Sequence, residues 1–322
     1  MVPLLIGNKK NSELKKLKGI FPIVYAFFNK NNTLDTKLIE EQIKLINKIG
    51  SNGIACLGLA TEVQKLSFKE KKIIIELIAD NCNNKIPTAI TIQGNTFDEY
   101  VKLIEVARFN QASWIILQPL LKTKNTSEEY CYNFYKKLIP YSKDTIVGIQ
   151  NAIEYMGVGL TPKKILKLYK SFPNFRAIKN EASSVFMENE IGQYPRDLHV
   201  FNGRGGQEIV DNFIIGCKGI VPCLDGADKF VKIYNFLQKK NINSAKNEYE
   251  KIIDIDSAIE DIENKMKDDY HNDNTSMMMS DDDFYTIQVI NVIDSIAIAE
   301  IIYPSQALYF PRIGDYFSIK SD

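Results

Sequence analysis

The chain has 322 residues, of which 45% are hydrophobic and 25% are charged, values typical of a folded globular protein. Its 40 lysines and arginines balance 40 aspartates and glutamates, so we expect no binding to nucleic acid or to a membrane surface. The presence of only two histidines, His199 and His271, excludes His-rich metal sites and leaves almost no material for a Ser-His-Asp triad.

Neither a targeting segment nor a membrane span is predicted. The apolar patch Val2 to Ile6 precedes the first lysines, which is the wrong order for a signal peptide, and no uncharged apolar run approaches ~18 residues. The five cysteines form no Cys-x-x-Cys pair, as is typical of reduced, buried thiols. We therefore expect a cytoplasmic protein without metal or cofactor, in which lysine, carboxylate and amide side chains carry the chemistry.

Alternating strands and helices are predicted from Gly19 to about Lys240, where a short apolar run, a polar loop and an amphipathic stretch repeat. Eight such units are the number that a (β/α)8 TIM barrel requires. The predicted strands are Ile20 to Ala26, Gly53 to Leu57, Thr88 to Ile92, Trp114 to Leu117, Thr145 to Ile149, Phe175 to Ile178, Leu198 to Phe201 and Gly219 to Val221.

Capping signals mark the helices between these strands. Leu38 to Ile49 has a largely apolar face, and Gly50 follows where the backbone can turn to positive φ. Hydroxyl and carboxylate pairs, or a hydroxyl followed by proline, mark further helix starts because they satisfy or remove unpaired backbone donors. These starts are Ser67 with Glu70, Thr96 with Glu99, and Thr161 with Pro162.

A doubly wound open sheet is the main alternative fold. It usually carries a Gly-rich phosphate loop after its first strand, but no such loop follows Ala26. The glycine cluster from Gly203 to Gly206 comes after the seventh predicted strand, where a barrel often places an anion-binding loop, although a tight turn explains it equally well. The sequence therefore favours the barrel.

Two domains are predicted, the barrel over residues 1–240 and a C-terminal helical extension over residues 241–322. Asn241 to Asp269 is predicted as a charged helix, and residues 270–283 as a polar connector. Phe284 to Tyr303 is apolar and is predicted as a helix that Pro304 ends.

Amide and amine side chains close the third to seventh predicted strands. Because reacting groups in a (β/α)8 barrel lie at the C-terminal ends of strands, these positions are candidates for the site. For any one amide, a strand emerging into water is an equal explanation, but five together favour a site. The residues are Gln93, Gln118, Gln150, Lys179 and Asn202, with Gly58 and Pro222 closing the second and eighth strands.

Lys179 is the strongest candidate. A lysine ringed by apolar strand residues is partly desolvated, which favours the neutral, nucleophilic amine, although most lysines at strand ends are solvated. Glu181, two residues on, could act as a general acid or base, or could complement the dipole of the next helix. His199 lies inside a predicted strand and is interpreted as a core or interface histidine.

At these residues the chain resembles the dihydrodipicolinate synthase and N-acetylneuraminate lyase family of class I aldolases, in order from Gly19 to about Tyr234. Gly58-Leu59-Ala60-Thr61-Glu62 lies at the family's Gly-Thr-Thr-Gly-Glu loop, and Ala177-Ile178-Lys179 resembles the Gly-Ile-Lys segment with the Schiff-base lysine. The resemblance implies a TIM barrel that binds a small 2-oxo acid substrate and assembles as a homo-oligomer, either a dimer or a tetramer.

Departures from the family pattern narrow the implied chemistry. Gln150 replaces the catalytic tyrosine, and an amide can orient a substrate but cannot relay a proton as a phenol does. Leu59 and Ala60 replace the threonines that complete the tyrosine relay, and Tyr155 stands in place of a carboxylate-binding arginine. Dihydrodipicolinate synthase activity is therefore not expected.

Gln150, Lys179 and Glu181 together are similar to the branch that contains L-2-keto-3-deoxyarabonate dehydratase. This resemblance implies that Lys179 forms the Schiff base, Glu181 moves a proton and Gln150 holds a hydroxyl. Backbone donors around Ala60 and Thr61 would then hold the substrate carboxylate. The further substrate contacts predicted are Gly58, Gln93, Gln118, Asn202 and Gly203.

Three functions follow from this assignment. The first is dehydration of a 2-keto-3-deoxy sugar acid. The second is retro-aldol cleavage of a similar acid to pyruvate and an aldehyde, which the loss of the tyrosine disfavours because cleavage needs a base for the substrate hydroxyl. The third is a catalytically inactive homologue that binds a 2-oxo acid.

Overall fold

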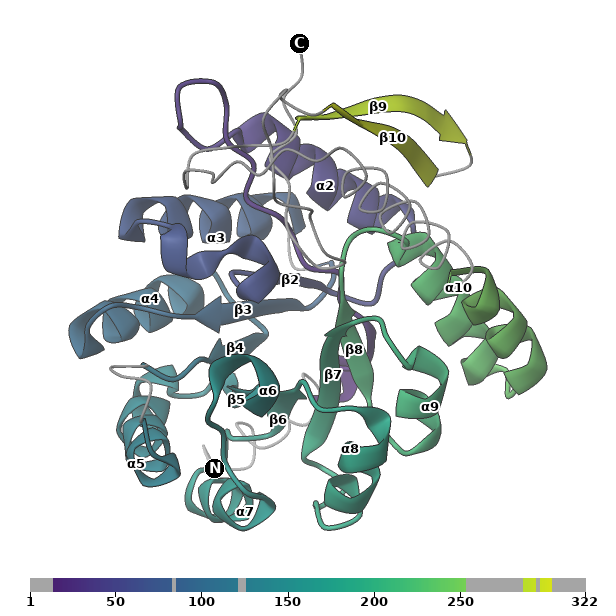
Figure 1. The fold of residues 1–322 in the computed structure, drawn as a ribbon. Coiled ribbons are helices and arrows are strands. Elements are labelled where there is room, and N and C mark those ends of the chain that lie inside the picture. The colour runs from purple at the N-terminus through teal and green to yellow at the C-terminus, as the bar shows by residue number, and fades with distance from the viewer. Residues whose placement is uncertain (1–13, 83–84, 121–125, 253–285, 294–295, 303–322) are drawn as a thin grey trace, which may run out of the picture.

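The computed structural model describes residues 14–82, 85–120, 126–252, 286–293 and 296–302. Eight parallel strands lie at the centre of the molecule and helices surround them (Figure 1). The strands are β1 (Gly19–Ile20), β2 (Ile54–Cys56), β3 (Thr88–Ile92), β4 (Trp114–Leu117), β5 (Ile146–Asn151), β6 (Ala177–Asn180), β7 (His199–Gly205) and β8 (Gly219–Pro222).

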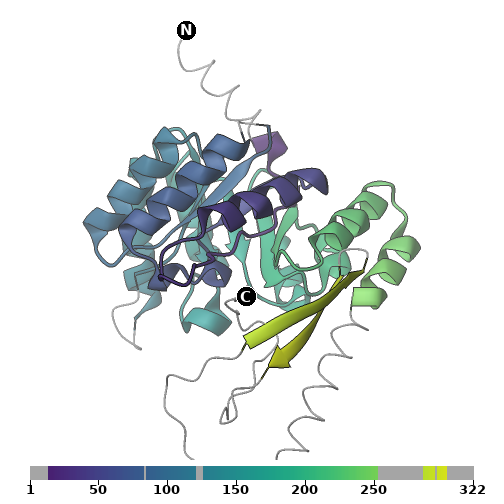
Figure 2. The ribbon, with the colours of Figure 1, turned by 90° about the horizontal axis from the view of Figure 1, so that it is seen from above.

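Helices follow the strands along the chain. Helices α2, α3 and α4 pack side by side along one flank of the barrel (Figure 2). The labelled α-helices among the described residues are α2 (Thr36–Lys48), α3 (Phe68–Cys82), α4 (Phe97–Phe109), α5 (Glu128–Leu138), α6 (Ile153–Met156), α7 (Pro162–Ser171), α8 (Ser184–Ile191), α9 (Ile209–Ile214) and α10 (Ala227–Gln238). Three short 3-10 helices are η1 (Leu59–Thr61), η2 (Val63–Lys65) and η3 (Ile139–Ser142).

The sheet closes on itself. Each strand from β2 to β7 pairs with the next, and β8 pairs with β1. The chain that continues from β1 then lies against β2, where Val24 N–H donates to Ala55 O at 2.9 Å and Ala55 N–H donates to Pro22 O at 2.9 Å. An open doubly wound sheet would leave two free edges, so the predicted (β/α)8 barrel is confirmed.

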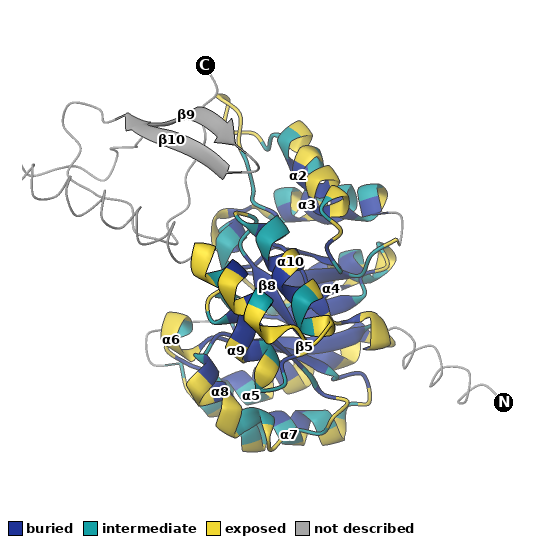
Figure 3. Cartoon of the chain, turned by 90° about the vertical axis from the view of Figure 1, so that its right-hand side faces the viewer, coloured by how far each residue is buried: buried dark blue, intermediate teal, exposed yellow. Residues whose placement is uncertain are grey.

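Two apolar layers form the core. Inside the barrel, large rings fill the space, with Phe201 lying 5.2 Å from Phe21 and 4.9 Å from Trp114 between ring centroids. Outside the barrel, a second cluster, which includes Val24 and Ile39, lies between the strands and the helices. The strands are therefore buried on both faces, whereas the helices expose their outer faces (Figure 3).

Strands β5, β6 and β7 run past their predicted ends. Gln150, Lys179 and Asn202 consequently lie within the sheet, where Gln150 pairs with Lys179. Their backbones are held by neighbouring strands, which fixes side-chain direction more firmly than a loop would.

Helix starts follow the capping prediction. Ser67 N–H donates to Glu70 Oε2 at 2.7 Å, and Glu70 N–H donates back to Ser67 Oγ at 3.3 Å, which confirms the capping box. Thr96 Oγ1 accepts from Glu99 N–H at 3.2 Å, but the Glu99 carboxylate accepts from Asn95 N–H instead of completing the box. Helix α7 begins at Pro162 as predicted.

The C-terminal region departs from prediction in one part. Residues 242–252 are helical, as expected, while residues 253–285, with the predicted polar connector, lie outside the described residues. The helix predicted over Phe284 to Tyr303 is wrong, because the described residues there form an antiparallel pair of strands, β9 (Thr286–Ile293) and β10 (Ile296–Ile302). Isoleucine, valine and threonine dominate both segments, and β-branched side chains favour strands.

None of the helices that the structure describes combines the length and apolar character needed to cross a membrane.

Candidate active site

Lys179 lies at the C-terminal end of β6 and points into the barrel. Ala177, two residues earlier, belongs to the interior cluster, and alternate residues of a strand share a face. Gln150 lies beside Lys179 on β5, and Gln118 follows β4 directly. Three neighbouring strands thus bring a lysine and two amides to the same end of the barrel, where reacting groups of this fold lie.

Glu181 joins this group because the sheet pairing continues beyond β6. Its N–H donates to Asn151 O at 3.0 Å, so the chain stays extended and Glu181 faces the same way as Lys179. Lys179 Nζ donates to Glu181 Oε1, and Gln150 Nε2 donates to the same oxygen at 2.6 Å. Gln118 Nε2 in turn donates to Gln150 Oε1 at 2.8 Å.

These four residues form a buried polar chain. Only 3% of Lys179, 2% of Glu181 and 1% of Gln150 is exposed. A buried charge is stable only when it is paired and hydrogen-bonded. Here Lys179 and Glu181 each provide the opposite charge and the hydrogen bond that the other needs. The contact also lets a proton pass between the amine and the carboxylate, which is what a lysine nucleophile needs in order to react.

Gly203 on β7 leaves room for this pair. A Cβ atom at Gly203 would lie 2.6 Å from Lys179 Cε and 2.9 Å from Glu181 Cγ, closer than real Cβ atoms approach. Gly58, after β2, faces the same space from the other side, since a Cβ there would lie 4.0 Å from Lys179 Nζ. Both predicted glycine contacts therefore lie beside the lysine.

We expect Gly203→Ala to lower kcat/KM by about 100-fold, because the methyl group displaces Lys179 and Glu181 and misplacement of about 1 Å carries that cost. Steady-state kinetics on the folded variant measures this loss of kcat/KM. Gly192→Ala, where the nearest atom to the new Cβ is 3.9 Å away, is the matched control and should leave kcat/KM unchanged. Equal effects of the two changes would contradict the steric argument.

Three other predicted contacts are engaged elsewhere. The Gln93 side chain accepts from Lys71 Nζ at 3.2 Å, and Lys71 lies on α3, outside the barrel. Asn202 Nδ2 donates to Ala182 O at 3.1 Å and so braces the loop after Glu181. Thr61 Oγ1 donates to Val24 O at 2.8 Å. The structure does not bring these side chains to the lysine, whereas Ala60 packs against the interior cluster at the mouth.

A second group at the mouth, formed by Tyr25, Cys223 and Asp225, was not predicted from the sequence. Tyr25 lies beyond Phe21 and Ile23 on the interior face, and Tyr25 OH donates to Asp225 Oδ2 at 2.6 Å. Burial, followed by the charges of Cys223 and Asp225, raises the pKa of Tyr25, so the phenol is protonated at neutral pH. The alternation of inward and outward side chains along the first predicted strand could have indicated that Tyr25 faces the interior.

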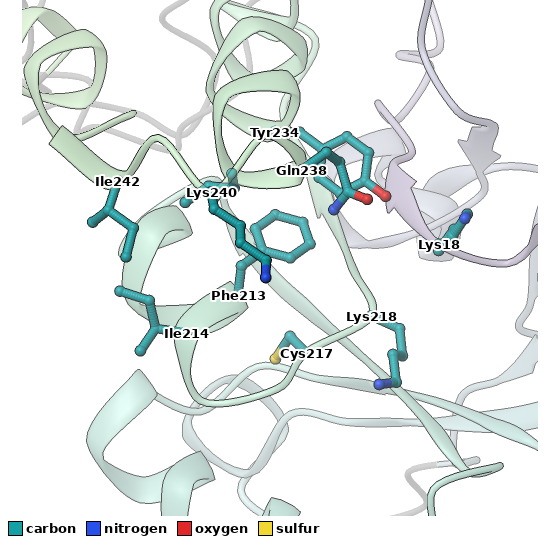
Figure 4. A pocket seen from close by; sticks show the side chains of 10 residues that line it. Lys18, Phe213, Ile214, Cys217, Lys218, Tyr234, Gln238, Lys240 and Ile242 are labelled. Carbon is teal, nitrogen blue, oxygen red and sulfur yellow. The ribbon is translucent and has the colours of Figure 1, made fainter. Parts of the chain in front are cut away.

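The opposite end of the barrel contains neither the polar chain around Lys179 nor the group around Tyr25. There His199 Nδ1 lies 2.8 Å from Leu17 O, and burial lowers the pKa of His199, as for a neutral core histidine. A cavity of about 430 Å³ lies at this end, where Lys18, Lys218 and Lys240 are among its lining residues (Figure 4). Because Lys179 is at the other end of its strand, this cavity does not contain Lys179.

Within the described ranges, no group of three His, Cys, Asp or Glu side chains is placed to hold a metal ion.

Comparison with known proteins gives one family match and several distant relatives. The model of the dihydrodipicolinate synthetase family matches residues 16–273. A 4-hydroxy-tetrahydrodipicolinate synthase of Methanococcus aeolicus is 23% identical over 241 residues, which are 74% of this chain and 82% of the relative. A protein of Escherichia coli named "Probable 2-dehydro-3-deoxy-D-pentonate aldolase" is 24% identical over 216 residues, 65% of this chain and 69% of that protein.

Solved structures show the same fold. A prophage protein of the dihydrodipicolinic acid synthase family from Escherichia coli, solved in complex with pyruvate, superposes with a TM-score of 0.69 at 20% identity, covering 74% of this chain and 81% of that one. The sialic acid aldolase of Ruminococcus gnavus gives a TM-score of 0.67 at 19% identity, covering 72% and 77%.

Proposed function

Because the chain belongs to the dihydrodipicolinate synthetase family and is an enzyme of its Schiff-base lyase class, we propose that it dehydrates a 2-keto-3-deoxy sugar acid. The observation that carries this proposal is the contact of the Lys179 amine with the Glu181 carboxylate, with Gln150 bonded to the same oxygen. A nucleophile and a proton-transfer group are thereby positioned together in a buried site.

In the proposed reaction Lys179 acts first, as the nucleophile, and Glu181 acts second, as the proton-transfer group. Lys179 attacks the C2 ketone, water leaves, and the resulting iminium acidifies the C3 protons. Glu181 takes one of these protons, and the enamine then expels the C4 hydroxyl, which leaves with the proton from Glu181 as water. Hydrolysis of the remaining imine frees Lys179. Glu181 therefore moves one proton from C3 to the leaving oxygen.

Amide groups fit the remainder of a sugar acid. Gln150 and Gln118 form a hydrogen-bonded pair beside the lysine, and their unused donor and acceptor positions suit substrate hydroxyls. The backbone N–H groups around Ala60 are the proposed binding place for the substrate carboxylate. Tyr155, which stands in place of the family's carboxylate-binding arginine, is 57% exposed and has no positive charge with which to bind it. The name of the pentonate aldolase relative supports a five-carbon acid. A homo-oligomer and a cytoplasmic location stay predictions.

Retro-aldol cleavage is a second candidate. The specific observation in its favour is the Tyr25 phenol at the mouth of the barrel, since the sequence argument against cleavage rested on the lack of a tyrosine on β5.

Trapping the imine tests the shared first step. We expect incubation with pyruvate and sodium borohydride to add one reduced pyruvate to Lys179, located by mass spectrometry of peptides. Lys71 is the internal control, because it is also fully buried but bonds to Gln93 and Glu99 outside the barrel, and it should stay unmodified. Folded protein that gives no adduct with any 2-oxo acid would support the inactive homologue instead.

A further inference from the structure

Tyr25 reaches the mouth of the barrel from the segment that follows β1. Phe21 and Ile23 belong to the interior cluster, Val24 belongs to the outer cluster, and Tyr25 packs on the interior cluster. This alternation points the Tyr25 ring inward, one layer nearer the mouth than Ile23. A Cβ at Gly58 would touch Ile23 Cδ1 at 2.6 Å and lie 4.0 Å from Lys179 Nζ, so Ile23 occupies the layer of the lysine.

The backbone and the hydroxyl of Tyr25 are both held. Tyr25 N–H donates to Gln42 Oε1 at 2.9 Å, and Gln42 Nε2 donates to Tyr25 O at 3.1 Å. At the other end, Tyr25 OH donates to Asp225 Oδ2 at 2.6 Å and accepts from Leu224 N–H at 3.2 Å. The phenol proton therefore points at a carboxylate, which is exposed to solvent on the loop after β8.

Cys223 lies beside this phenol, directly after β8. Burial, followed by the charge of Asp225, raises the pKa of Cys223, while a hydrogen bond with Tyr25 and the charge of Lys179 act in the opposite direction. The thiol thus lies beside the Tyr25 hydroxyl and stays protonated. A neutral Cys223 is not a nucleophile.

We propose that Tyr25 and Asp225 form a proton relay for the C4 hydroxyl of the substrate, and that this relay gives the site a second reaction, aldol cleavage. The inference rests on the proposed function, because the iminium on Lys179 is the electron sink for both reactions. Tyr25 touches the substrate and is catalytic, whereas Asp225 acts through Tyr25 as a positioning residue.

The cleavage step balances without a further reactant. The C4 hydroxyl gives its proton to the Tyr25 oxygen as the phenol proton passes to Asp225. The C3–C4 bond breaks, its electron pair forms the C2–C3 double bond of the enamine, and C4 leaves as an aldehyde. Glu181 takes a proton from solvent and gives it to C3, water hydrolyses the imine to pyruvate and Lys179, and Asp225 releases the proton it received to solvent.

Dehydration does not need this relay. In that reaction Glu181 carries the only proton that moves, from C3 to the leaving oxygen. A phenol whose proton already points at a carboxylate accepts a proton from a hydroxyl more readily than it donates one. The arrangement of Tyr25 and Asp225 therefore suits cleavage, and Tyr25, in the segment after β1, performs the function that Gln150 on β5 cannot perform.

Two assays with defined probes distinguish the contribution of the Tyr25 and Asp225 relay from that of imine formation on Lys179. The first follows deuterium exchange into the methyl group of pyruvate by NMR, which requires Lys179 and Glu181 alone. The second follows condensation of pyruvate with glycolaldehyde, the reverse of cleavage, which also requires a proton for the aldehyde oxygen. We expect Tyr25→Phe and Asp225→Asn to slow condensation about 100-fold and to leave exchange within about three-fold.

Tyr169→Phe is the matched control, because Tyr169 OH donates to Asp197 Oδ1 at 2.5 Å in a similar exposed bridge. It should change neither assay. Equal loss of exchange and condensation in Tyr25→Phe, or no loss of either, would overturn the relay, and so would a wild-type enzyme that exchanges but never condenses. Absence of exchange in the wild type overturns the proposed function itself. Asp225→Asn, on an exposed loop, tests the relay even where Tyr25→Phe unfolds.

Discussion

Replacement of Lys179 by alanine is expected to abolish the borohydride-trapped adduct and to lower kcat by about 10⁴-fold or more, because it removes the amine that we propose forms the imine. The same change leaves the Glu181 carboxylate buried without its cation, which costs about 3 kcal/mol of the free energy of unfolding. Mass spectrometry measures the adduct, and denaturant unfolding identifies the conditions under which the variant remains folded for kinetics.

A second buried lysine provides the control. Lys71→Met removes a lysine that is fully buried but contacts Gln93 and Glu99 on the helix side of the sheet. This variant should be less stable than the wild type and should still form the adduct. An adduct that persists in Lys179→Ala, or that disappears in Lys71→Met, would show that Lys179 is not the residue that forms the imine.

Glu181→Gln is expected to lower kcat by about 10²-fold to 10⁴-fold while the adduct still forms. Glutamine keeps the shape of the side chain and its hydrogen bonds to the site, but it cannot accept a proton from C3. The rate of deuterium exchange into pyruvate measures this loss directly, since exchange needs a base after the imine has formed. In this variant the adduct should therefore still form while the exchange rate falls.

Glu190→Gln is the control for removing a nearby carboxylate. Glu190 lies on α8, where its Oε2 accepts from Asn180 Nδ2 at 2.9 Å, and burial raises the pKa of this carboxyl. We expect exchange and turnover to stay within about three-fold of the wild type. If Glu190→Gln slowed exchange as much as Glu181→Gln, proton transfer could not be assigned to Glu181.

Much of the fold followed from local chemistry. Strands β3 and β4 coincide with their predicted runs, and α2 lies where an apolar face and Gly50 placed it. Each of these signals depends on residues close together in the chain. The helix predicted over residues 284–303 failed for the same reason, because a short apolar run suits either element until a partner strand is present.

Local residue patterns predicted the eight strand and helix units, and they marked Lys179, Glu181 and Gln150 as candidates, because strand order in a parallel barrel brings successive strand ends together. Only the tertiary structure decided which strand-end side chains meet the lysine. Gln93 turns to Lys71 on the outside, whereas Gln118 turns inward to Gln150. The contact of Tyr25 with Asp225 spans 200 positions and exists only because β1 and β8 pair to close the barrel. No local pattern encodes that closure, and the proposed proton relay depends on it.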